Sequence, residues 1–187
     1  MTPTFRTSRP GSAADPSKPH LILIGLPGSG KTTVGKAVAE RTGRTFLDLD
    51  QEIERREGRS IGEIFGEKGE PYFRAKERQL TEELTLVGNM IVAPGGGWVV
   101  DTAVISIVCP PSQLVYLIVS PETALRRLGP LRTLRPLLMR PDPLAELQRL
   151  LESRRAAYES ADHKISTELH DLQRVIDMVT ELASAAG

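Results

Sequence analysis

The sequence has little cysteine and no long apolar run. Cys109 is its single cysteine, so no disulfide can form within the chain, and we expect a cytoplasmic protein in a reducing compartment. No apolar run approaches the roughly 20 residues that a membrane-spanning helix needs, so we expect no membrane association.

A net charge of either sign is also missing. The 24 basic and 24 acidic residues cancel, so the chain lacks the overall positive field that draws proteins onto nucleic acids or anionic membranes. An anionic ligand would have to be bound by local charge. The 187 residues, 40% of them hydrophobic, suffice for one domain with one sizeable core. Because no long exposed apolar face is evident, we expect a monomer.

The chain divides into a short tail and one domain. Residues 1–19 are rich in proline, serine and threonine and have no periodic apolar pattern. That composition is typical of a disordered tail. Residues 20–187 carry the pattern of a single α/β domain.

Short apolar runs alternate with helical patterns along this domain. The runs that predict strands are LILIG at 21–25, TFLDLD at 45–50, IVAP at 91–94, QLVYLIVS at 113–120 and HKIST at 163–167. This alternation predicts a three-layer α/β fold, in which helices cover both faces of a central five-stranded parallel sheet. In such folds ligands bind beyond the carboxyl ends of the strands.

Two stretches do not fit the simple alternation. Residues 50–86 hold about three helical segments, which is more than one crossover between strands needs, and they predict a helical insertion. Residues 128–143 are rich in proline and contain Arg132, Arg135 and Arg140. We interpret them as a mobile, basic lid, because phosphoryl-transfer enzymes often close a loop over the reaction to exclude water. A proline-rich linker is the alternative.

The strongest motif follows the first strand. Gly25, Gly30, Lys31 and Thr32 satisfy the pattern G-x-x-x-x-G-K-[ST] between a predicted strand and a predicted helix, which indicates a phosphate-binding P-loop. Glycines let backbone N–H groups surround an anion, and the helix N-terminus adds its positive dipole end. Lys31 would reach the β- and γ-phosphates of ATP, and Thr32 would bind Mg²⁺. The other residues that we expect to bind the nucleotide are Gly28, Ser29 and Thr33.

Two carboxylates close the second predicted strand. Asp48 and Asp50 are one residue apart, so on a strand both would point towards the side of the phosphate loop. We expect Asp48 to order Mg²⁺ through water, and Asp50 to accept a hydrogen bond and then the proton from the attacking hydroxyl. The alternative is that Asp50 only caps the next helix.

Later motifs, in their order and approximate spacing, indicate a family. GLPGSGKTT and FLDLD are followed by the FR of PYFRAKE, the triple glycine of APGGGWV, RPLL, and the R-x-x-x-Y of RRAAY. From about His20 to Thr167 the chain resembles the shikimate kinases, a family within the nucleoside-monophosphate-kinase-like P-loop kinases. One feature departs. After the fifth strand that family usually has Asp-Thr and then a proline in the loop around adenine, whereas this chain has Ser166, Thr167 and ELHDLQR.

The resemblance implies transfer of the γ-phosphate of MgATP to the 3-hydroxyl of shikimate, in the route to aromatic amino acids. It implies that Asp50 grips the acceptor hydroxyls and that Arg74 and Arg154 clamp the acceptor carboxylate. It also implies that the backbone of Gly96 and Gly97 contacts shikimate and that Glu77 is the acid that orients Arg74. On the nucleotide side, it implies that Arg127 packs on adenine and that Arg135 is the lid arginine that neutralises the moving phosphoryl group.

The residue types agree with these roles. A planar guanidinium matches a carboxylate through two hydrogen bonds, and glycine lets the backbone approach a small ring closely. Each feature also has a plainer interpretation. Arg74 and Arg154 could lie on solvated, salt-bridged helix faces, and Gly95–Gly97 could form a simple turn. Trp98, which follows the glycines, is more often a packing residue than a ligand platform.

Two other functions remain open from the sequence. One is a related small-molecule kinase that phosphorylates gluconate or a nucleoside monophosphate, although the combination of Arg74, the triple glycine and Arg154 argues against it. The other is a non-catalytic domain that senses shikimate and regulates a partner. Such a domain could lose Lys31, Asp50 or Arg135 without losing its fold, and all three are present.

Overall fold

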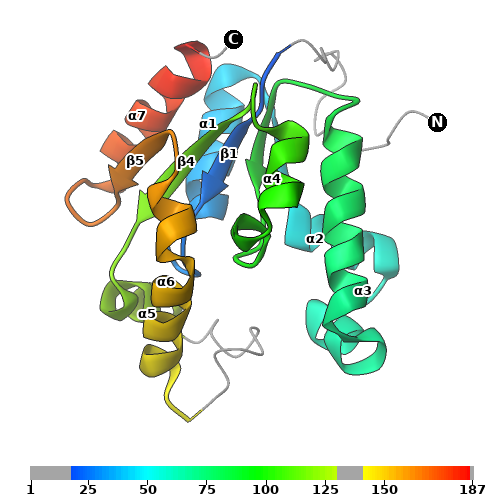
Figure 1. The fold of residues 1–187 in the computed structure, drawn as a ribbon. Coiled ribbons are helices and arrows are strands. Elements are labelled where there is room, and N and C mark those ends of the chain that lie inside the picture. The colour runs from blue at the N-terminus through cyan, green and yellow to red at the C-terminus, as the bar shows by residue number, and fades with distance from the viewer. Residues whose placement is uncertain (1–17, 130–140, 186–187) are drawn as a thin grey trace.

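A five-stranded sheet forms the centre of the computed structural model, which describes residues 18–129 and 141–185 (Figure 1). Its strands are β1 (Leu21–Ile24), β2 (Thr45–Asp48), β3 (Met90–Ala93), β4 (Gln113–Ile118) and β5 (His163–Ser166). The strand order is β2-β3-β1-β4-β5, and every neighbouring pair is parallel. The predicted five-stranded parallel sheet is therefore confirmed.

Helices connect the strands as the alternation predicts. They are α1 (Lys31–Thr42), α2 (Leu49–Glu57), α3 (Ile61–Leu84), the short 3-10 helix η1 (Trp98–Val100), α4 (Thr102–Val108), α5 (Pro121–Leu128), α6 (Pro143–Glu159) and α7 (Leu172–Ala185). Within the described ranges, no helix is both long enough and apolar enough to cross a membrane.

Alternate residues of the central strand point to opposite faces of the sheet and create two separate cores. Leu21 and Leu23 of β1 pack with residues of α1 and α7 on one face. Ile22 and Ile24 pack on the other face with residues of α2, α3, α4, α5 and α6. A strand buried on both faces is expected to be apolar throughout, as LILI is. The result is the predicted three-layer fold (Figure 1).

Two helices connect β2 and β3, and the longer one, α3, is kinked. The backbone of α3 is not helical at Gly69 (φ 79°, ψ 168°), so α3 comprises two helical pieces, and with α2 the three predicted segments are present. Ion pairs join the helices. Arg56 of α2 bonds Glu83 of α3 at 2.8 Å, and Glu57 accepts hydrogen bonds from Lys68 and Tyr72.

The predicted tail and lid fall mostly outside the described residues. Residues 1–17 and 130–140 are not described, and the latter range includes Arg132, Arg135 and Arg140. The lid prediction and the role of Arg135 therefore stay predictions.

Candidate active site

The loop between β1 and α1 has a backbone that only glycine adopts easily. Gly28 and Gly30 have positive φ angles of 83° and 95°. A Cβ atom on Gly28 would lie 2.6 Å from the carbonyl oxygen of Ala124, so the loop also lies too close to α5 for a side chain there. Both features fix the curled path that the P-loop pattern predicts.

The N-terminus of α1 presents its backbone N–H groups without a side-chain cap. Such groups favour an anion. The ammonium of Lys31 donates to the carbonyl oxygens of Gly25 (2.8 Å) and Leu26 (3.1 Å), so it lies across the loop. Ser29 is fully buried within the loop, and Thr33 is exposed on the first turn of α1.

Thr32 and Asp48 meet where β2 ends. The hydroxyl of Thr32 donates to Oδ2 of Asp48 at 3.1 Å. A hydroxyl and one carboxylate fit Mg²⁺, which takes few protein ligands and keeps phosphate oxygens and waters around it. No cluster of three or more His, Cys, Asp or Glu side chains suited to a metal occurs in the described part of the chain.

The prediction that Asp48 and Asp50 lie on one strand and point to the same face is wrong. The strand ends at Asp48, and Asp50 lies in the first turn of α2, so the two side chains do not share a strand face. Asp48, not Asp50, caps this helix, because its Oδ1 accepts the backbone N–H of Gln51 at 3.2 Å. The helical turn nevertheless directs Asp50 at the glycine turn. A Cβ atom on Gly95 would collide with Oδ1 of Asp50.

The glycines after β3 each face a different predicted site residue. A Cβ atom on Gly95 would meet Asp50 and also Oε1 of Glu77 at 3.1 Å. One on Gly96 would lie 2.5 Å from Nη1 of Arg154, and one on Gly97 would overlap the guanidinium of Arg74. This turn therefore brings together side chains from α2, α3 and α6. The sequence-based assignment included Gly96 and Gly97 but omitted Gly95, which is as close to the site residues as they are.

Arg74 is held by carboxylates on both sides. It donates to Glu70 through Nε (3.1 Å) and Nη2 (2.9 Å), and its Nη1 bonds Oε2 of Glu77. The predicted i, i+3 pair of Arg74 and Glu77 is thus present. These bonds orient the guanidinium before any acceptor arrives.

Glu77 is buried and carries an unpaired oxygen. Its residue exposure is 2%, and Oε1 has no hydrogen-bond partner among the residues that the structure describes. Burial raises the pKa of Glu77 to about 7, helped by the neighbouring negative charges of Asp50 and Glu70 and opposed by Arg74. This carboxyl therefore titrates near neutral pH.

Arg154 is buried on α6, with a residue exposure of 9%. The solvated-face interpretation is therefore wrong for this arginine. One helical turn later, Tyr158 stacks on Tyr116 of β4 with ring centroids 4.8 Å apart, and this packing fixes the inner face of α6. Arg74 and Arg154 thus reach adjacent glycines from helices far apart in the sequence.

Arg127 joins α5 to the segment that follows β5. It donates to the hydroxyl of Thr167 (2.7 Å) and to the carbonyl oxygen of Thr167 (2.5 Å). Beside it, Glu168 accepts hydrogen bonds from the backbone and hydroxyl of Ser120. The departure from the family pattern at Ser166 and Thr167 is visible in the sequence, but these two links are not. No local pattern marks partners that lie 40 or more residues apart.

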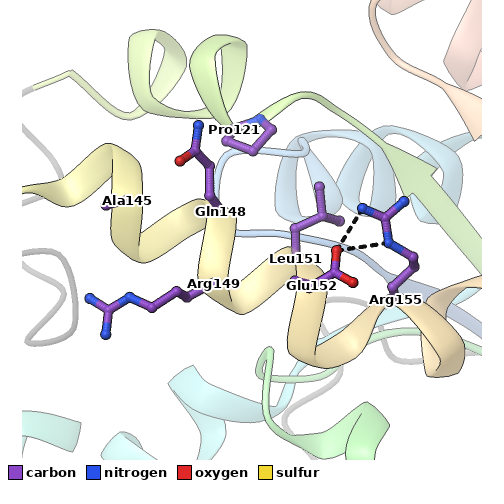
Figure 2. Close-up of a pocket in the computed structure, with 7 residues that line it drawn as sticks. All are labelled: Pro121, Ala145, Gln148, Arg149, Leu151, Glu152 and Arg155. Atoms are coloured by element: carbon purple, nitrogen blue, oxygen red, sulfur yellow. Dashed lines mark hydrogen bonds and ion pairs between the residues drawn. The ribbon is translucent and has the colours of Figure 1, made fainter.

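A separate open pocket of about 460 Å³ lies beside α5 and α6 (Figure 2). Pro121, Gln148 and Leu151 line it, together with Arg155 and Glu152, which form an ion pair at 2.7 Å. None of the predicted site residues that the structure describes lines this pocket. We therefore place the candidate site at the glycine turn and the phosphate loop, not here.

Comparison with known proteins gives consistent matches. A family model described as shikimate kinase matches residues 27–184. The chain is 41% identical over 172 residues to the shikimate kinase of Thermobifida fusca, covering 91% of this chain and 98% of that relative. It is 37% identical over 170 residues to the shikimate kinase of Symbiobacterium thermophilum, covering 90% and 98%. A solved structure of shikimate kinase from Acinetobacter baumannii in complex with shikimate has a TM-score of 0.82 and 35% identity, covering 90% of this chain and 94% of that one.

Proposed function

The chain belongs to the shikimate kinase family, and from that membership we propose that it is an enzyme that transfers the γ-phosphate of ATP to the 3-hydroxyl of shikimate. The product is shikimate 3-phosphate, in the biosynthesis of chorismate and the aromatic amino acids. The observation that carries the proposal is the glycine turn, where two arginines and an aspartate from three helices lie against three consecutive glycines. Cations and a carboxylate at one small site suit an acceptor that carries both a carboxylate and hydroxyls.

The acceptor is held at its two ends. Arg74 and Arg154 bind the carboxylate of shikimate, and the backbone of Gly96 and Gly97 contacts its ring. Asp50 accepts a hydrogen bond from the attacking hydroxyl and takes its proton as the new P–O bond forms and the bond from the γ-phosphorus to the bridging oxygen of ADP breaks. Any residue larger than glycine at these positions would place a Cβ atom against Asp50, Arg154 or Arg74 and displace the side chains that bind the acceptor.

The phosphate donor is held by the loop before α1. Gly28, Ser29, Gly30 and Thr33 contribute loop and helix N-terminus, and Lys31 exchanges its carbonyl partners for oxygens of the β- and γ-phosphates. Thr32 and Asp48 would hold Mg²⁺, directly and through water. When bound, that ion supplies positive charge to the phosphates and orders them for in-line transfer. Arg127 would pack on the adenine, and Arg135 would neutralise the moving phosphoryl group from the lid.

The domain assignment is part of the same proposal. Residues 20–187 form one kinase domain after the tail at 1–19, residues 50–86 form the acceptor-binding insertion, and residues 128–143 form the lid. The support for the insertion is that α2 and α3 supply Asp50, Arg74 and Glu77 to one site. A cytoplasmic monomer that binds neither nucleic acid nor membrane remains our prediction.

The test is a coupled ADP-release assay with MgATP and a panel of acceptors. We expect turnover with shikimate, and values of kcat/KM at least 100-fold lower with gluconate and with nucleoside monophosphates, since specificity is the ratio of these constants. Turnover with gluconate or a nucleotide at a similar rate would refute the acceptor assignment. Shikimate binding without any ADP release would instead favour the sensor function.

A further inference from the structure

Trp98 is the first residue after the glycine turn and the only tryptophan in the chain. It opens η1, and its backbone N–H donates to the carbonyl oxygen of Gly95 at 3.1 Å, which closes the turn. Its side chain is buried, with 2% exposure. The expectation that it packs rather than stacks on a ligand is consistent with this burial. Packing alone, however, does not account for its polar contact.

The indole of Trp98 makes a buried hydrogen bond to α3. Nε1 donates to the hydroxyl of Thr81 at 2.9 Å, and that hydroxyl donates in turn to the backbone carbonyl of Glu77 at 2.8 Å. Thr81 has no exposed surface. The hydroxyl of Thr81 therefore donates one hydrogen bond within α3 and accepts one from the indole. Both the buried hydroxyl and the buried indole N–H thus have a hydrogen-bond partner.

Thr81 belongs to the face of α3 that forms the acceptor side of the site. Residues 74, 77 and 81 follow the i, i+3, i+7 spacing that places side chains in one row along a helix. Arg74 and Glu77 of this row lie against Gly97 and Gly95. The bond from Trp98 to Thr81 is thus a direct polar tie between the glycine turn and the row of side chains that faces it.

We propose that Trp98 and Thr81 are positioning residues for the acceptor: their hydrogen bond fixes the spacing between the glycine turn and Arg74, and so sets the affinity for the acceptor carboxylate. The inference rests on the proposed function. Neither residue touches the reacting atoms. Precise spacing matters here because hydrogen bonds need near-ideal distances and angles, and misplacement by about 1 Å can cost about 100-fold in rate.

The decisive variants are Thr81→Val, which removes the acceptor of the indole N–H at nearly constant volume, and Thr81→Ser, which keeps it. We expect Thr81→Val to raise the KM for shikimate by about fivefold to tenfold, because a buried donor loses its partner and the turn shifts. The KM for ATP should change by less than about twofold, since the phosphate loop lies on other elements. Thr81→Ser should stay within about twofold of wild type in both constants.

Thr180→Val is the matched control. Thr180 of α7 makes the same i−4 hydroxyl-to-carbonyl bond, to Ile176 at 2.7 Å, but lies in the layer on the opposite face of the sheet. It should leave both KM values unchanged. Trp98→Phe should also raise the shikimate KM. Because both substitutions remove the same hydrogen bond, the double variant with Thr81→Val should have a shikimate KM no higher than that of the more impaired single variant.

A second experiment measures shikimate binding without catalysis. The emission of Trp98, titrated with shikimate alone, gives a dissociation constant that should weaken in Thr81→Val by the same factor as KM. If the wild type phosphorylates shikimate and Thr81→Val loses only thermal stability at an unchanged shikimate KM, the bond is merely structural and the inference is wrong. Equal KM increases in Thr81→Val and Thr180→Val would overturn it as well. A wild type that fails to phosphorylate shikimate refutes the proposed function itself.

Discussion

Replacing Gly97 by alanine tests the glycine turn with the smallest possible change. The backbone of Gly97 is ordinary, with φ −84° and ψ −21°, so alanine introduces no conformational strain there. The new methyl group would lie 2.6 Å from Cζ of Arg74, and the two terminal nitrogens would be closer still. The whole effect of the substitution is therefore a collision with one guanidinium.

The size of the effect follows from what Arg74 must do to avoid this methyl group. A normal contact needs a further displacement of about 1 Å, and the side chain is 36% exposed, so it can swing outward without unfolding the protein. In moving it leaves the acceptor carboxylate. A charged hydrogen bond contributes about 1.5–3 kcal/mol, which corresponds to a loss of roughly 10-fold to 150-fold in kcat/KM for shikimate.

The assay measures initial rates at varied shikimate and varied MgATP for the wild type, Gly97→Ala and Gly66→Ala. Gly66 is the matched control, because it lies on α3 and no described residue has an atom within 4 Å of the position where its Cβ would stand. Gly66→Ala should keep all kinetic constants and raise stability by about 0.5–1 kcal/mol through helix propensity. Thermal melts should show both variants folded.

An unchanged shikimate KM in Gly97→Ala would show that the turn does not face the acceptor. A rise in the KM for ATP as large as that for shikimate would assign the turn to the nucleotide instead. Either result would refute the reasoning from Gly97 to Arg74.

Four further predictions address the other parts of the site. Lys31→Ala should fold but lose about 100-fold or more in kcat with MgATP, because a preorganised charge on the phosphates is lost; circular dichroism and initial rates check this. Asp50→Asn should abolish most turnover yet keep nucleotide affinity, measured by calorimetry, because the change removes the base and spares the phosphate loop. Arg74→Lys should raise the shikimate KM about tenfold with little change for ATP, and an amide analogue of shikimate should be a poor acceptor for the wild type. Glu77→Gln should gain stability relative to wild type as pH rises from 4.5 to about 7, by up to about 3 kcal/mol, because the native carboxyl holds its proton to about pH 7 while the unfolded one releases it near 4.5; urea unfolding at pH 5 and pH 8 measures the difference.

The sheet could be predicted from the sequence because its strands are short apolar runs separated by helical patterns. The end of β2 could not. Leu49 and Asp50 continue the apolar–polar alternation of TFLD, so the sequence pattern extends the strand to Asp50. In the structure, however, Asp48 caps α2 and ends the strand. Capping competes with strand extension at a residue that suits both, and only the packing of α2 decides between them.

The phosphate loop could be predicted because its residues are contiguous and its geometry is local. The proposed acceptor side depends on contacts between distant segments. Physical patterns alone left Arg74 and Arg154 as possible surface residues, and only the order of the family motifs brought them together. Even that order gave no sign of Thr81 beneath Trp98 or of Thr167 beside Arg127, because neither pair has a spacing that a helix or a strand would mark.

The two cores on opposite faces of the sheet anchor α1 separately from the helices that carry Arg74 and Arg154. Lys31 and Thr32 stand on α1, which is anchored by Val34 and Val38 in one core, whereas α3 and α6 are anchored in the other. Substitutions in separate cores that share no partners combine almost additively. A change that reshapes the acceptor side can therefore accumulate without repacking the helix beneath the phosphates. Directed evolution towards a new hydroxy acid should begin with libraries in the core that holds α3 and α6, and leave the α1 and α7 layer untouched.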